Sequence, residues 1–127
     1  MTTEPVLRAE LAHVVTEADT AIALGSGDVP VLATPRLLAW CEEATVQAIA
    51  PALESTQTTV GVRVELDHLA ATPVGGTVRI SAEVVASEGS RYTFALHAED
   101  DHAPVATGTV VRARVDRERF LARLPKG

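Results

Sequence analysis

The chain has 127 residues, of which 46% are hydrophobic and 22% are charged, a composition typical of one globular domain over residues 1–127. Its formal net charge of −6 excludes a general nucleic-acid or anionic-membrane surface, because both need positive charge spread over one face. The single cysteine, Cys41, excludes a disulfide framework within the chain. Met1–Val15 has no signal-peptide pattern, and no apolar stretch approaches the ~18 residues that span a bilayer, so we expect a cytoplasmic protein.

Hydrophobic periodicity predicts one strand, then one long helix, then four strands. Thr34 and Pro35 are typical of a helix start, since Thr caps helices and Pro fits the first helical position. Asp116 is a second candidate cap, for a short C-terminal helix. The predicted elements, in chain order, are a strand at 6–16, an irregular segment at 17–31, a helix at 34–50, strands at 58–68, 78–84, 92–98 and 105–115, and a helix at 116–124.

The order of these elements predicts an α+β fold. Strands joined by short turns pair antiparallel, and one helix must cover one face of their sheet. An antiparallel sheet wrapped around one long central helix is the hotdog fold. The other face and the edges of such a sheet need cover, so we expect at least a homodimer, with a tetramer as a further option.

Two adjacent glutamates on the helix receive different predicted positions. At ~100° per residue, Glu42 falls inside the apolar stripe, whereas Glu43 falls on the opposite, solvated face. A buried carboxylate is costly unless it is paired or lies in a wet cleft. Glu42 is therefore either a functional group or the partner of a backbone group or an arginine across an interface. The predicted stripe comprises Leu38, Cys41, Thr45, Val46, Ala48, Ile49 and Leu53.

Polar and small residues also interrupt apolar patterns elsewhere. His68 continues the alternating face of Val60, Val62, Val64 and Leu66, where a histidine is either a satisfied core residue or a catalyst. His13 continues the apolar face of the first strand in the same way, and no role is predicted for it. Gly61 lies inside a strand, where glycine is unfavourable unless a bulge or a close ligand approach requires it. Thr34 is predicted as the helix N-cap, although a hydroxyl beside free helical N–H groups would also assist chemistry.

Several segments together resemble the fluoroacetyl-CoA thioesterase family of hotdog proteins. They are Ala33-Thr34 at the helix start, Glu42 eight residues on, the run VQAIAP at 46–51, and the run HLAATP at 68–73. The resemblance extends from about Leu32 to Phe120. It implies that Thr34, Glu42 and His68 form a catalytic set, with Gly61 near the thioester and Arg112 in the last strand as substrate-binding residues.

The resemblance implies hydrolysis of an acyl-CoA thioester to the free acid and coenzyme A. The family's lid phenylalanines have no counterpart in residues 17–33, so the predicted substrate is a short-chain acyl-CoA rather than fluoroacetyl-CoA specifically. Arg112 and Arg114 are candidate anchors for the coenzyme A phosphates. No metal or other cofactor is expected, because coenzyme A is part of the substrate. The alternatives are a non-catalytic acyl-CoA-binding hotdog module and, ranked last, an enoyl-CoA hydratase.

Overall fold

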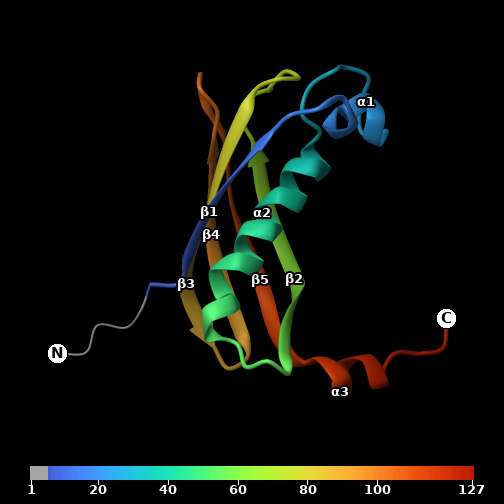
Figure 1. The fold of residues 1–127 in the computed structure, drawn as a ribbon, viewed down its shortest axis with the longest axis vertical. Coiled ribbons are helices and arrows are strands. Elements are labelled where there is room, and N and C mark those ends of the chain that lie inside the picture. The colour runs from blue at the N-terminus through green and yellow to red at the C-terminus, as the bar shows by residue number, and fades with distance from the viewer. Residues whose placement is uncertain (1–5) are drawn as a thin grey trace.

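A computed structural model describes residues 6–127 as an antiparallel sheet of five strands with one long helix on one of its faces (Figure 1). Among the described residues, no helix combines the length and the apolar character that a bilayer span requires. In chain order the elements are β1 (Arg8–Val14), a 3-10 turn (Glu17–Asp19), α1 (Ala21–Leu24), α2 (Thr34–Ile49), a 3-10 turn (Ala50–Ala52), β2 (Gln57–His68), β3 (Thr77–Glu88), β4 (Arg91–Glu99), β5 (Pro104–Asp116) and α3 (Arg117–Ala122).

The sheet has the strand order β1-β3-β4-β5-β2, and every neighbouring pair is antiparallel. Helix α2 crosses one face of this sheet and packs mainly on β1 and β3, while β2 forms one edge beside it (Figure 1). This arrangement confirms the predicted hotdog fold. Asp116 caps α3 by accepting a hydrogen bond from Arg119 N at 3.0 Å, which confirms the predicted C-terminal helix.

The buried face of α2 differs in part from the predicted stripe. Leu37, Trp40 and Ala44 are buried, whereas Val46, which belongs to the predicted stripe, is 47% exposed in one chain. The reason is that α2 packs mainly on β1 and β3, so the buried face of the helix is the one turned toward these two strands. The buried helix residues are Leu37, Trp40, Cys41, Ala44, Thr45, Ala48 and Ile49.

A β-bulge interrupts β2 and corrects the predicted alternation. Gly61 pairs with Arg112 and Arg63 pairs with Val111, which leaves Val62 as the extra residue between them. Before the bulge it is Thr59 that is buried, so the prediction that Val60 continues one face through to His68 is wrong. The extra residue reverses which side chains of β2 face the helix and places Gly61 on that side.

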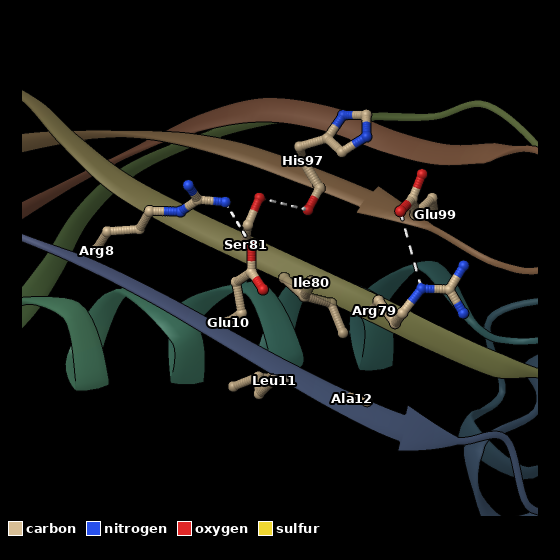
Figure 2. A pocket seen from close by; sticks show the side chains of 9 residues that line it. All are labelled: Arg8, Glu10, Leu11, Ala12, Arg79, Ile80, Ser81, His97 and Glu99. Carbon is tan, nitrogen blue, oxygen red and sulfur yellow. Dashed lines mark hydrogen bonds and ion pairs between the residues drawn. The ribbon is translucent and has the colours of Figure 1, made fainter.

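A hollow of about 460 Å³ lies on the sheet face away from α2, over β1, β3 and β4 (Figure 2). Its charged side chains already pair with one another: Arg8 pairs with Glu10, and the Arg79 Nε lies 3.8 Å from Glu99 Oε1. His97 at its rim is exposed, as expected. The predicted catalytic residues Thr34 and His68 lie on the other side of the sheet. We therefore do not place the active site in this hollow.

Gly108 generates a test of the contact between β5 and β2. A Cβ at this position would lie 2.2 Å from the backbone oxygen of Glu65, so the two paired strands would have to separate. We expect Gly108→Ala to lower the free energy of unfolding in urea by about 1–3 kcal/mol. The exposed neighbour Thr107→Ala is the control and should stay within about 0.5 kcal/mol of the wild type. Equal stability of the two variants would contradict the close approach.

Candidate active site

Helix α2 and the end of β2 bring Thr34 and His68 together. Thr34 is the first residue of α2, and Ala33 occupies the N-cap position without a side-chain cap, so the predicted capping role of Thr34 is wrong. The hydroxyl oxygen of Thr34 instead lies 2.7 Å from His68 Nδ1 in a hydrogen bond. The hydroxyl therefore contributes to a polar pair at the helix N-terminus rather than to the helix itself.

The second ring nitrogen of His68 has surroundings that differ from those of the first. Nε2 is buried, and it has no hydrogen-bond partner among the described residues. Burial lowers the pKa of His68 below its usual value, although the backbone of Ala70 acts in the opposite direction. The imidazole is therefore neutral at pH 7. Thr34 and His68 both line a hollow of about 360 Å³, whose other walls come from residues 21–32 and 69–71.

Glu42 forms a second polar pair further along α2. Its Oε2 accepts a hydrogen bond from Arg112 Nη1 at 3.2 Å, and the Arg112 side chain is almost fully buried. Arg112 also donates from Nε to Thr59 Oγ1 at 2.9 Å and from Nη2 to Thr59 O at 3.1 Å. The guanidinium is thus held against Glu42 within one chain, and its predicted contact with a coenzyme A phosphate stays a prediction. Arg114 donates to the Tyr92 hydroxyl at 2.7 Å.

Gly61 leaves room for the Glu42 carboxylate. A Cβ at position 61 would lie 2.9 Å from Glu42 Oε2 and 3.7 Å from Arg112 Nη1. Both reasons that favour glycine inside a strand therefore apply, since Gly61 adjoins the bulge and a functional group approaches its backbone. The sequence does not predict Thr59, the fourth member of this cluster, because a bulge that moves it to the helix side has no clear sequence pattern.

Within one chain the two pairs lie apart. Thr34 and Glu42 are eight helical positions from each other, which corresponds to about 12 Å along the axis and about 80° around it. That separation is too long for a direct hydrogen bond between the two side chains. The structure therefore brings together Thr34 with His68, and Glu42 with Gly61 and Arg112, but it does not join all three predicted catalytic residues in a single chain.

Two further side chains of reactive types, Cys41 and His13, have contacts that indicate a structural role. Burial raises the pKa of the Cys41 thiol to about 12, with a further contribution from Glu42, so the nucleophilic thiolate is scarce at neutral pH. His13 stacks on Trp40 with a ring separation of 4.5 Å, and its Nε2 lies 2.7 Å from Glu43 Oε1. This contact connects β1 to α2.

In residues 6–127 we find no group of three or more His, Cys, Asp or Glu side chains placed to hold a metal ion.

Known proteins share both the sequence and the fold of this chain. A model of the family "Fluoroacetyl-CoA-specific thioesterase" matches residues 15–118. The fluoroacetyl-CoA thioesterase of Streptantibioticus cattleyicolor is 36% identical over 94 residues, which are 74% of this chain and 68% of that protein. A solved structure of the fluoroacetyl-CoA thioesterase FlK superposes with a TM-score of 0.87 at 30% identity, covering 98% of this chain and 100% of that chain.

A mutant of the same enzyme, solved in complex with fluoroacetate and CoA, superposes with a TM-score of 0.84 at 31% identity. This match covers 93% of this chain and 99% of the other. The agreement in sequence and fold confirms the resemblance noted at the helix start and at the HLAATP run. The chain belongs to the fluoroacetyl-CoA-specific thioesterase family, and it is an acyl-CoA thioesterase with the hotdog fold.

Proposed function

We propose that this enzyme hydrolyses short-chain acyl-CoA thioesters with Thr34 and His68 of one subunit and Glu42 of a second copy. The observation that carries the proposal is the Thr34–His68 hydrogen bond, made by two residues that both line one hollow. A pocket with a neutral imidazole and a helix N-terminus suits a thioester carbonyl, which gains negative charge during attack. The substrate named for the relatives, fluoroacetyl-CoA, has the same thioester group.

A second copy of the chain would bring a Glu42 close to a Thr34–His68 pair, which one chain keeps apart. Strand β2 is a sheet edge. Its residues Val62 and Val64 are 44% and 42% exposed, and Val46 of α2 is 47% exposed. A long edge strand flanked by uncovered valines is a template for pairing with another chain. A two-fold axis beside β2 would set the two α2 helices next to each other in opposite directions. Glu42 of one copy would then lie toward Thr34 and His68 of the other.

In the proposed reaction, Glu42 accepts a proton from water while the resulting hydroxide adds to the thioester carbonyl carbon. The tetrahedral intermediate then collapses, the C–S bond breaks, and coenzyme A leaves as the thiol once the proton is returned. His68 donates to the oxyanion or orients the water, according to which ring nitrogen carries its proton. Direct attack by the Glu42 carboxylate, followed by hydrolysis of the resulting anhydride, uses the same residues.

The absence of phenylalanine from the segment before α2 bears on the acyl preference. Residues 17–33 contain no phenylalanine, and the hollow at Thr34 is lined by both small and branched side chains, such as Gly27, Ala71 and Leu69. We therefore propose a short-chain acyl preference without specificity for fluorine. We also propose that the reaction needs no resident cofactor, because water, a carboxylate and an imidazole suffice for hydrolysis. A cytoplasmic location is a separate part of the proposal.

Replacing the candidate base tests the assignment directly. We expect Glu42→Gln to lower kcat by about 10²–10⁴-fold, because the amide cannot accept the proton from water, and His68→Ala to lower kcat strongly as well. The measurement is thiol release from acetyl- to medium-chain acyl-CoA. Glu43→Gln is the matched control, since this adjacent carboxylate is exposed and contacts His13 of β1 rather than Arg112. Full activity of Glu42→Gln would contradict the role, and binding without thiol release by the wild type would indicate an acyl-CoA-binding module.

The protonation of His68 gives a second test. Because burial lowers its pKa, the imidazole should titrate below pH 6.5, and activity should fall as acidification protonates it. An NMR titration of the histidine ring resonances, assigned by comparison with His68→Ala, measures the midpoint. A midpoint at or above 6.5 would contradict the buried, neutral state that the proposal requires.

The interface gives a third test. Val64→Glu places a charge on the uncovered face of β2, so we expect a monomer with little activity. Val85→Glu is the control, because Val85 is also an exposed strand valine, at 59%, but lies on β3 away from this face. Light scattering coupled to size exclusion measures the mass. A monomeric wild type, or a fully active Val64→Glu monomer, would contradict the two-copy site.

A further inference from the structure

A buried polar pair, Asp100 and Thr72, lies outside the proposed chemistry. Asp100 is 8% exposed and Thr72 is 1% exposed, and the Thr72 hydroxyl donates a 2.9 Å hydrogen bond to Asp100 Oδ2. The two residues are 28 positions apart in the sequence, so their bond connects separate parts of the fold. A buried carboxylate is costly, which makes the position of this one informative.

The two oxygens of Asp100 have different partners. Oδ1 accepts hydrogen bonds from His102 N at 2.8 Å and from Ala103 N at 2.9 Å, and Asp100 N donates to Ala103 O at 3.0 Å. These bonds complete the turn between β4 and β5 with one carboxylate oxygen. Oδ2 is therefore not needed for the turn, and Thr72 is its hydrogen-bond partner.

Thr72 links the two segments that carry the Thr34–His68 pair. It lies four residues after His68, in the loop that follows β2. Its backbone oxygen accepts a 2.9 Å hydrogen bond from Leu32 N, two residues before Thr34. The loop is also held at its start, where Leu69 N donates to Val105 O at 2.7 Å. Thr72 is thus the point at which the entry to α2 and the exit from β2 meet.

We propose that Asp100 is a positioning residue for the active site, which acts through Thr72 to fix the segments carrying Thr34 and His68 and so sets their hydrogen bond. The effect on turnover rests on the proposed function, whereas the effect on the geometry of His68 does not. A displacement of about 1 Å at a reacting group can cost about 10²-fold in rate, so a brace of this kind affects kcat more than KM.

The negative charge of Asp100 strengthens its hold on Thr72. Burial by itself raises the pKa of this carboxyl, but the hydrogen bonds from His102, Ala103 and Thr72 outweigh burial and hold the pKa below its usual value. Asp100 is therefore ionised at neutral pH, and hydrogen bonds to an ionised acceptor are stronger than those between neutral groups. The carboxylate fixes Thr72 more firmly than an amide would.

The test compares variants that remove or keep the Thr72 hydroxyl. Thr72→Val keeps the branched shape but cannot donate to Asp100, whereas Thr72→Ser keeps the donor. Arg79→Gln is the matched control: Arg79 Nη2 donates to Asp100 O at 3.0 Å, so its loss weakens the same turn without touching Thr72. For each variant we would measure Tm, kcat and KM for acyl-CoA, and the nitrogen-15 resonances of the His68 ring.

We expect Thr72→Val to lower kcat by about ten- to a hundredfold with little change in KM and to shift the His68 ring resonances. Thr72→Ser and Arg79→Gln should keep kcat within about threefold of the wild type, even where Tm falls. Should Thr72→Val not fold, Asp100→Asn is the milder variant, with a smaller loss of kcat and a shift of the same resonances.

A folded Thr72→Val protein with wild-type kcat and unshifted His68 resonances would overturn the proposal. A loss of kcat that follows Tm equally in Thr72→Val and Arg79→Gln would also overturn it, because that result indicates a purely structural role. Should the wild type release no thiol, the proposed function fails, and the His68 resonances alone then decide the positioning role.

Discussion

The rigid spacing between Thr34 and Glu42 on helix α2 is the constraint on which the proposed active site depends. An α-helix holds residues eight positions apart at about 12 Å, and side chains of this size cannot close that gap. In the proposed site the helix therefore presents a carbonyl-binding end at Thr34 and a carboxylate near its middle. A second helix running in the opposite direction is the simplest way to bring one of each together.

The side chains of His68 and Glu42 are each held in place by contacts within one chain. His68 is half-buried and neutral, and one of its ring nitrogens is bonded to Thr34. In the proposed site the other ring nitrogen serves the substrate. Glu42 lies over Gly61 and against Arg112, which is itself fixed by Thr59. The local contacts of one chain thus orient Thr34, His68 and Glu42, and in the proposed site only their final juxtaposition depends on a second copy.

The sequence predicts this fold well because its main features are local. The long helix, the alternating strands and the cap at Asp116 follow from short-range patterns, and the eight-residue spacing of the candidate residues is visible directly. The bulge at Val62 and the non-capping role of Thr34 are not predictable, because both depend on long-range partners. For the same reason the sequence places Glu42 in the apolar stripe without showing that its arginine partner comes from β5 of the same chain.

The most direct test of the shared site is to combine two inactive variants in one dimer. Glu42→Gln and His68→Ala subunits, carrying different tags, would be co-expressed and assayed for thiol release. In a shared site, each mixed dimer contains one intact set of residues and one doubly altered set. A random mixture should therefore recover about a quarter of the wild-type activity, and purified mixed dimers about half. Mixed dimers no more active than either variant alone would contradict the account.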